Sequence, residues 1–196
     1  MKKSVIIIIV VAVVAIGLFS WVKGTYNGMV KADEGVQAAW SQVENVYQRR
    51  ADLIPNLVST VKGYAAHESQ TLENVVAARS KATQMTLDPE NLTSESLANY
   101  QKAQGELGAA LGRLLMIQEN YPDLKANENF RDLQSQLEGT ENRITVERQR
   151  FNDAARAYNT MIREFPKNIF AGMFGFEKKP YFEAEESAKT APKVEF

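Results

Sequence analysis

Hydrophobic residues first gather in one unbroken run near the N-terminus. The stretch from Ser4 to Val22, SVIIIIVVAVVAIGLFSWV, contains no charged side chain. At about 1.5 Å per residue it forms roughly 28 Å of helix, close to the thickness of the hydrocarbon core of a bilayer. A cleaved signal peptide is the alternative, but its apolar part is usually shorter and ends in a small-residue cleavage site, which LFSWVKG does not match. We therefore expect a transmembrane anchor over residues 1–23.

The charges that flank this run predict its orientation. Lys2, Lys3 and the α-amino group precede the run, and Lys23 and Lys31 follow it. Basic residues favour the cytoplasmic side, and the excess here is about one charge. We expect the N-terminus inside and the rest of the chain on the outer side of the membrane.

Beyond the anchor, apolar positions recur with the period of a helix. A first stripe has spacings of 4, 3, 4 and 7 residues: Val36, Trp40, Val43, Tyr47 and Ile54. A second stripe consists of Leu57, Val61, Tyr64, Leu72, Val75 and Ala82. Pro55 separates the stripes, and a proline kinks a helix or lies in its first turn. We expect a corner between two helices at Pro55, with Asp52 as a candidate cap of the second helix.

Two further helices are predicted, over about 96–119 and 127–165, because loop signals separate two more stripes. Gly105, Gly108 and Gly112 lie in the first of them, where we expect them to allow close helix packing. No sustained alternation of apolar and polar residues indicates a strand. The pattern predicts an all-α protein, with the N-terminal transmembrane helix followed by an antiparallel up-down four-helix bundle over residues 24–165.

Composition narrows the classes of function. The chain has 23 basic and 24 acidic side chains, and this balance argues against a nucleic-acid-binding protein. It has no cysteine, which excludes disulfides, a thiolate nucleophile and a cysteine-ligated zinc site.

The single histidine, His67, precedes Glu68 and suggests acid–base or metal chemistry. A zinc site of the HExxH type needs a second histidine where this chain has Thr71, and no other histidine or cysteine can join it. We expect a polar pair at the edge of the bundle, no metal or cofactor, and no enzymatic activity.

Basic and acidic residues also gather before Pro55, namely Arg49, Arg50 and Asp52. Arg50 falls on the apolar stripe, and a buried arginine is costly unless it is paired. We expect an ion pair that locks the corner, or else a docking point for a carboxylate or a lipid phosphate. The candidate partners of Arg50 are Asp52, Glu44, or a carboxylate on the last predicted helix such as Glu147.

Residues 166–196 differ from the bundle. Aromatic residues lie among glycines and prolines up to Phe182, and a small, charged and mobile tail is expected after them. An up-down bundle returns this segment to the level of the anchor, where Phe170, Phe174 and Phe176 are candidate contacts. They suit the bilayer interface or a neighbouring membrane protein, or they fold over the open end of the bundle.

Two long stretches, Tyr26–Arg79 and Tyr158–Glu186, resemble the LemA family. The resemblance implies a protein of the bacterial inner membrane with a helical-bundle domain, and no accepted catalytic residues. It also implies envelope partners such as a membrane metalloprotease of the HtpX type, and some magnetosome-membrane proteins resemble the family. We expect a non-enzymatic scaffold or adaptor that binds membrane proteins or itself as a homo-oligomer. The alternative is a protein that binds or shapes the membrane surface through its aromatic segment.

Overall fold

The computed structural model describes residues 3–183, which are helical without any strand. The helices in chain order are α1 (Lys3–Tyr64), α2 (Ser69–Gln84), α3 (Ser94–Met116), the 3₁₀ helix η1 (Ile117–Glu119), α4 (Pro122–Ala126), α5 (Glu128–Arg163) and α6 (Lys167–Phe174). The tail that we expected to be mobile lies, from residue 184 onward, outside the described residues.

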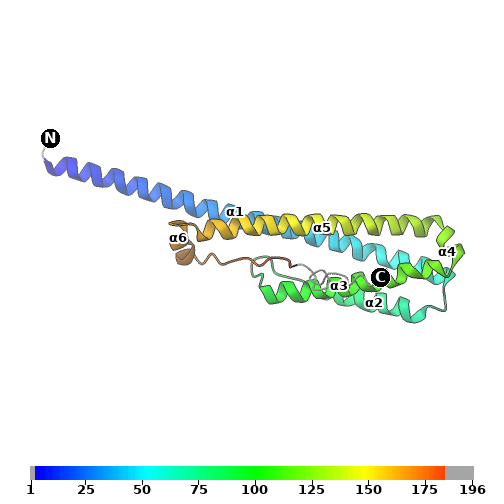
Figure 1. The fold of residues 1–196 in the computed structure, drawn as a ribbon. Coiled ribbons are helices and arrows are strands. Elements are labelled where there is room, and N and C mark those ends of the chain that lie inside the picture. The colour runs from blue at the N-terminus through cyan, green and yellow to red at the C-terminus, as the bar shows by residue number, and fades with distance from the viewer. Residues whose placement is uncertain (1–2, 184–196) are drawn as a thin grey trace, which may run out of the picture.

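The longest element, α1, is a continuous helix of 62 residues, about 93 Å in length. Its N-terminal part projects alone beyond the other helices (Figure 1). This part contains a window of mean hydropathy 3.1, none of which is buried. Within the described residues, α1 is the one helix long and apolar enough to cross a membrane.

Our prediction of a corner at Pro55 is wrong. α1 continues through Pro55 to Tyr64, because Ile54 and Leu57 on either side of the proline are completely buried. A proline inside a helix leaves the carbonyl four residues earlier without its usual donor. That carbonyl belongs to Ala51, and Arg79 of α2 donates to it from Nε at 2.8 Å. Pro55 therefore creates an attachment point for α2.

The chain turns instead at residues 65–68, between α1 and α2. Ala65 is fully buried, and its carbonyl accepts a hydrogen bond from the amide of Glu68 at 3.1 Å. Asp52 caps no helix, since its carboxylate accepts a hydrogen bond from Gln48 one turn earlier in α1, at 2.7 Å.

Two helix pairs build the remainder of the molecule. α1 packs along α5, α2 packs along α3, and α1 also contacts α2 (Figure 1). The loop before α3 ends in a reciprocal cap, in which Thr93 and Ser96 bond each other's backbone amides. Asn127 caps α5 by accepting from the amide of Phe130 at 2.9 Å. α5 agrees with the predicted last helix to within two residues at each end.

The core divides into two clusters along the helix pairs. The first surrounds Trp40, with Tyr100 and Phe151 packed edge-on against it. The second surrounds the buried side chains on either side of Pro55, with Leu107 and Phe130 from α3 and α5. Arg50 lies on α1 between the residues of the two clusters.

After α5 the chain forms α6 and then runs back as an extended segment beside α5 (Figure 1). Gly175 ends α6 in the left-handed conformation, with φ of 75°, which glycine adopts without a steric penalty. This reversal points the chain from α6 towards α3.

Candidate functional site

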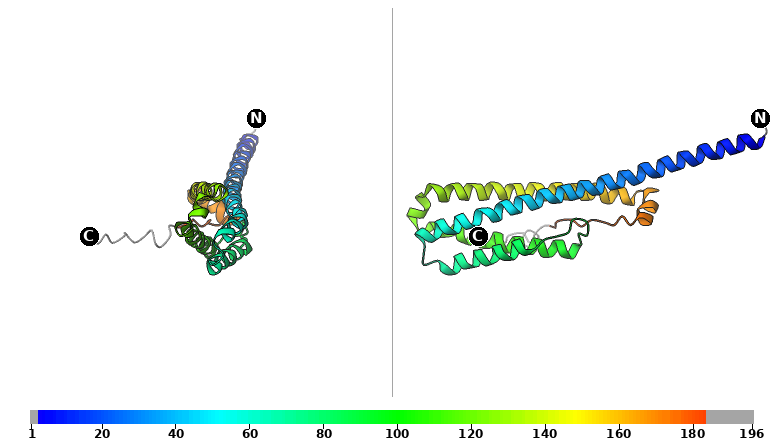
Figure 2. Two further views of the ribbon diagram at one scale, coloured as in Figure 1. Left: turned by 90° about the vertical axis from the view of Figure 1, so that its right-hand side faces the viewer. Right: turned by 180° about the vertical axis from the view of Figure 1, so that it is seen from behind.

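The three phenylalanines predicted as contacts pack onto α1 where its apolar run ends. The ring of Phe170 lies edge-on to Trp21, with centroids 5.4 Å apart. The ring of Tyr26 lies edge-on to those of Phe174 and Phe176, with centroids 5.0 and 5.7 Å apart. Edge-on aromatic pairs are favourable beyond the area that they bury. They hold α6 beside α1 at the end of the helix pairs from which α1 projects (Figure 2).

Other apolar residues are exposed on α6 and in the turn before it. Phe165, Ile169 and Met173 are 82%, 51% and 71% exposed. Ile169 and Met173 are four residues apart in α6, so they lie on one side of the helix, whereas Phe165 lies in the turn before it. We did not single out these residues from the sequence. The four-residue spacing of Ile169 and Met173 is the sequence signal for an apolar face. Apolar residues also occupy buried positions nearby, so the spacing alone does not tell which face is exposed.

The extended segment after α6 is held by two asparagines of α5. Asn159 donates from Nδ2 to the carbonyl of Lys179 at 2.8 Å and accepts from its amide at 2.9 Å. Asn152 makes the same two bonds with Phe182, at 3.0 and 2.8 Å. Each asparagine side chain thus bonds both the amide and the carbonyl of one residue, in the way that a neighbouring β-strand would.

The segment is also tied to α1. The ammonium group of Lys179 is buried and lies 3.0 Å from a carboxylate oxygen of Asp33. The ring of Phe182 stacks on Trp40 at 6.0 Å. Burial raises the pKa of the neighbouring Tyr158 to about 12, and the Asp33 carboxylate adds to the rise. The segment therefore fixes α6 through contacts on two helices.

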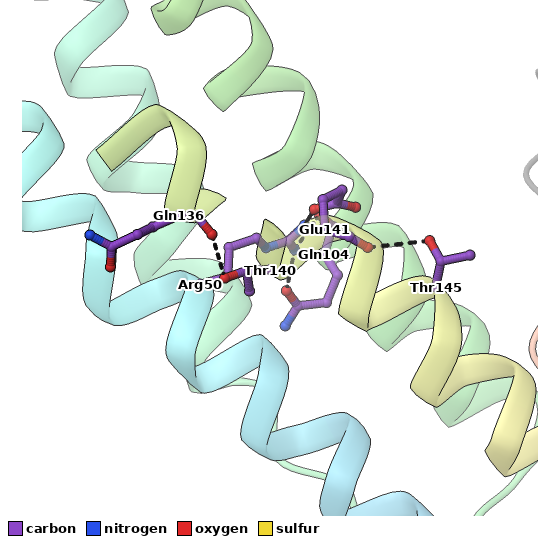
Figure 3. Close-up of polar contacts among 6 residues, drawn as sticks. All are labelled: Arg50, Gln104, Gln136, Thr140, Glu141 and Thr145. Carbon is purple, nitrogen blue, oxygen red and sulfur yellow. Dashed lines mark hydrogen bonds and ion pairs between the residues drawn. The ribbon is translucent and has the colours of Figure 1, made fainter. Parts of the chain in front are cut away.

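Arg50 forms a second polar cluster, which joins three helices (Figure 3). Its guanidinium donates from Nη1 to Glu141 at 2.9 Å, and from Nη2 to the backbone and side-chain oxygens of Gln104 at 3.0 and 2.7 Å. Arg50 is 3% exposed, whereas Glu141 is 58% exposed. Thr140 and Thr145 flank Glu141 and donate to carbonyls of α5 itself (Figure 3).

The prediction that a carboxylate of the last helix pairs with Arg50 is confirmed, but the residue is Glu141 and not the example given, Glu147. Neither Asp52, Glu44 nor Glu147 pairs with it, and the ion pair does not lock the corner between α1 and α2. Arg50 instead connects α1 with α3 and α5. Its guanidinium carbon also lies 5.1 Å from the ring centroid of Tyr47, within the range of a cation–π contact.

The other polar candidates do not join this cluster. Arg49 is exposed on α1, and His67 is exposed in the turn after it. Glu68 is half-buried and accepts a hydrogen bond from the hydroxyl of Tyr121 at 3.2 Å. About 21 Å of helix separates Arg50 from Tyr64, the last residue before that turn. Among residues 3–183, no group of three His, Asp or Glu side chains is arranged to hold a metal ion.

A groove of about 490 Å³ lies beside Arg50 between α3 and α5. Gly105, Gly108 and Gly112 line it. A methyl group added at Gly105 or Gly112 would have no neighbour within 4 Å, and one at Gly108 would lie 3.8 Å from Nη1 of Arg50. The prediction that these glycines allow close helix packing is therefore wrong for Gly105 and Gly112, which face open space, whereas Gly108 lies beside the guanidinium of Arg50.

The comparison with known proteins yields one family. The model of the LemA family matches residues 39–196. Magnetosome proteins MamQ 1 and MamQ 2 of Paramagnetospirillum magneticum are each 29% identical to this chain, over 84% of it and 67% of their own length. Protein LemA of Metamycoplasma hominis is 24% identical, over 89% of this chain and 76% of its own length. The relatives and the exposed apolar part of α1 both indicate association with a membrane. Because the family model spans most of the residues and agrees with the resemblance seen in the sequence, this chain belongs to the LemA family.

Proposed function

We propose that this protein is a non-enzymatic scaffold of the bacterial inner membrane. A single N-terminal span anchors an antiparallel four-helix bundle over residues 24–165, and the charge bias favours the outer side for the bundle. The scaffold binds partner membrane proteins close to the bilayer.

One observation carries the proposal: the exposed apolar face of α6. Ile169 and Met173 lie exposed on one side of α6, Phe165 is exposed in the turn before it, and α6 is packed onto α1 where the apolar run ends. Exposed apolar residues gathered on one face are typical of interaction sites. The length of the apolar run supports a position of that face near the membrane surface, within reach of another membrane protein.

Several observations support the rigidity that a scaffold requires. The backbone of the extended segment is paired with asparagines, and Lys179 is buried against Asp33.

The comparisons offer no known enzyme among the named relatives, and the polar candidates are spread over separate parts of the fold. A membrane metalloprotease of the HtpX type and a second copy of this chain are the partners that we would look for first.

In-cell photo-crosslinking from Met173 tests the proposal. Met116 is the matched control, because it is 61% exposed but lies at the opposite end of the helix pairs, at the end of α3. We expect crosslinks to one or a few membrane proteins from residue 173 and not from residue 116. The variant that combines Ile169→Ser with Met173→Ser should fold normally and yet weaken the interaction, probed by crosslinking from position 165. Equal products from 173 and 116 would contradict the proposal.

The same face of α6 favours a second candidate function, binding or shaping of the membrane surface. Phe165, Ile169 and Met173 could enter the interfacial layer of the bilayer instead of meeting a protein. Crosslinks from residue 173 to lipid alone would favour this function over the scaffold.

A further inference from the structure

The groove between α3 and α5 has a polar end and an apolar end. The end nearer to α6 is lined by polar and charged side chains, those of Tyr47, Arg50, Gln101, Gln104 and Arg148. The other end is lined by side chains that neither donate nor accept hydrogen bonds, those of Ala109, Leu111, Leu115 and Leu137. The volume of about 490 Å³ is in the usual range for a small-molecule site. This division is typical of a site for a molecule with one polar and one apolar end.

Arg50 has unused donors at the polar end. A guanidinium carries five N–H groups, and the bonds of Arg50 to Glu141 and Gln104 use three of them. Within the described residues, Nε has no hydrogen-bond partner, and Nη1 makes one bond although it carries two hydrogens. Arg50 is 3% exposed, so water reaches these donors poorly. A buried charged donor without a partner is costly, and the carboxylate of a ligand would satisfy it.

Gly108 leaves room for an oxygen atom beside this guanidinium. A methyl group at position 108 would lie 3.8 Å from Nη1 of Arg50, which is an ordinary van der Waals contact. Because glycine lacks this methyl group, an acceptor oxygen in the groove can approach Nη1 closely. Alanine at this position would fit the fold and fill the space that the oxygen needs.

A second guanidinium, that of Arg148, lies at the same end of the groove. The pKa of the Tyr47 hydroxyl is raised by burial and partly lowered by the charges of Arg148 and Arg50, so both guanidiniums are close to it. The acids that line the groove are Glu138 and Glu141. Glu141 pairs with Arg50, whereas Glu138 bonds to the preceding turn of α5, away from Arg148. The lining of the polar end therefore combines two cations with one carboxylate, which favours an anionic ligand.

The distance from the membrane indicates where the ligand comes from. Arg50 lies about 42 Å along α1 from Val22, the last residue of the apolar run. With that run in the bilayer, a lipid that stays in the membrane does not reach the groove, so the ligand is a free molecule. An apolar chain suits the far end better than a peptide does, because the side chains there offer no partners for backbone groups.

We propose that the groove between α3 and α5 binds a free amphiphilic carboxylate, of the class of medium-chain fatty acids. Its carboxylate accepts a hydrogen bond from Nη1 of Arg50 beside Gly108 and is attracted by Arg148. Its alkyl chain lies over Leu111, Leu115 and Leu137. This binding is separate from the scaffold function, because no residue of the groove belongs to α6.

Thiol protection in the full chain, held in lipid nanodiscs, tests the proposal, because the chain has no cysteine of its own. Ala109→Cys places a thiol in the groove, and Gly139→Cys places one on α5 outside the residues that line it. The probe is octanoate. We expect it to slow maleimide labelling of residue 109 several-fold, with a saturable dependence on concentration, and to leave residue 139 unchanged. Butyrate, which has almost no apolar chain, and octanol, which has no carboxylate, should protect residue 109 much less.

A substitution at Gly108 tests the place of the carboxylate. Gly108→Ala fills the space beside Arg50, and Gly139→Ala is the matched control, because it makes the same replacement in a helix outside the groove. Both should favour the helix to a similar degree, so a difference between them does not come from folding. We expect Gly108→Ala to remove most of the protection that octanoate gives to residue 109, and Gly139→Ala to retain it.

Three results would overturn the proposal. One is that octanoate leaves the labelling of residue 109 unchanged, which is also the result expected if another part of the protein fills the groove. Another is equal protection of residues 109 and 139, since that is a detergent effect. The third is that octanol protects residue 109 as well as octanoate does and that Gly108→Ala makes no difference, because the groove would then bind apolar chains without the help of Arg50.

Discussion

At the scale of single residues, Arg50 shows what a pattern of apolar positions can and cannot predict. Its place on a buried stripe correctly indicates that it needs a partner. The partner itself, Glu141, lies 91 residues away on a different helix, and Gln104 lies on a third. Periodicity defines the face of each helix but not the height at which two helices meet. The nearby carboxylates of Asp52 and Glu44 were therefore the wrong choice, whereas a carboxylate of the last helix was the right one, at Glu141 and not at Glu147.

The asymmetry of this ion pair leads to a first prediction. Arg50→Ala should lower the free energy of unfolding by about 3–5 kcal/mol, because it removes buried contacts on three helices. Glu141→Gln should cost about 1–2 kcal/mol, because Gln104 still binds the guanidinium. Chemical denaturation followed by circular dichroism measures both values. Arg49→Ala, on an exposed neighbour, is the control and should change stability by less than about 0.5 kcal/mol. A larger loss for Glu141→Gln than for Arg50→Ala would contradict the account.

At the scale of helices, the sequence predicts that the chain is helical and where the loops around α3 and α5 lie. It does not predict that α1 continues through Pro55. A proline inside a helix costs about 3 kcal/mol, and the burial of Ile54 and Leu57 together with the bond from Arg79 outweighs that cost. The sequence around the proline shows neither of these contacts. The turn at residues 65–68 contains no proline or glycine, so it lacks the usual sequence signal.

This arrangement predicts that Pro55 and Arg79 are energetically coupled. Arg79→Ala should cost about 1–2 kcal/mol while Pro55 is present, because the Ala51 carbonyl then loses its donor. In a Pro55→Ala background the helix supplies its own donor to that carbonyl, so the same change should cost clearly less. A double-mutant cycle from denaturation curves measures the difference. Additive effects would show that the proline does not create the attachment point.

The extended segment gives a third prediction. Asn159→Ala should accelerate amide hydrogen exchange at Lys179 and its neighbours, because two bonds to that backbone are lost. Amides in the core part of α1 should exchange as before. Asn142→Ala, at an exposed position of the same helix, is the matched control. Unchanged exchange at Lys179 would mean that the asparagine does not hold the segment.

At the scale of the whole molecule, the sequence correctly indicates an all-helical chain with an apolar N-terminal helix and a likeness to the LemA family. The aromatic segment shows where the prediction stops. Phe170, Phe174 and Phe176 are conspicuous in the sequence, but they pack towards α1. The exposed face of α6 consists of Ile169 and Met173, with Phe165 exposed in the turn before it. Which side of a short helix is covered depends on neighbours that come from distant parts of the chain. The groove between α3 and α5 escapes prediction for the same reason.

The central claim is that this outer face of α6 lies at the membrane surface, and a depth measurement tests it most directly. Met173→Cys in the full chain carries a spin label, and its relative accessibility to oxygen and to a water-soluble nickel complex is measured in lipid nanodiscs. Met116→Cys serves as the distant control. The account predicts that the label at 173 reports the interfacial layer of the bilayer and that the label at 116 reports bulk water. Bulk-water values at both positions would contradict the claim.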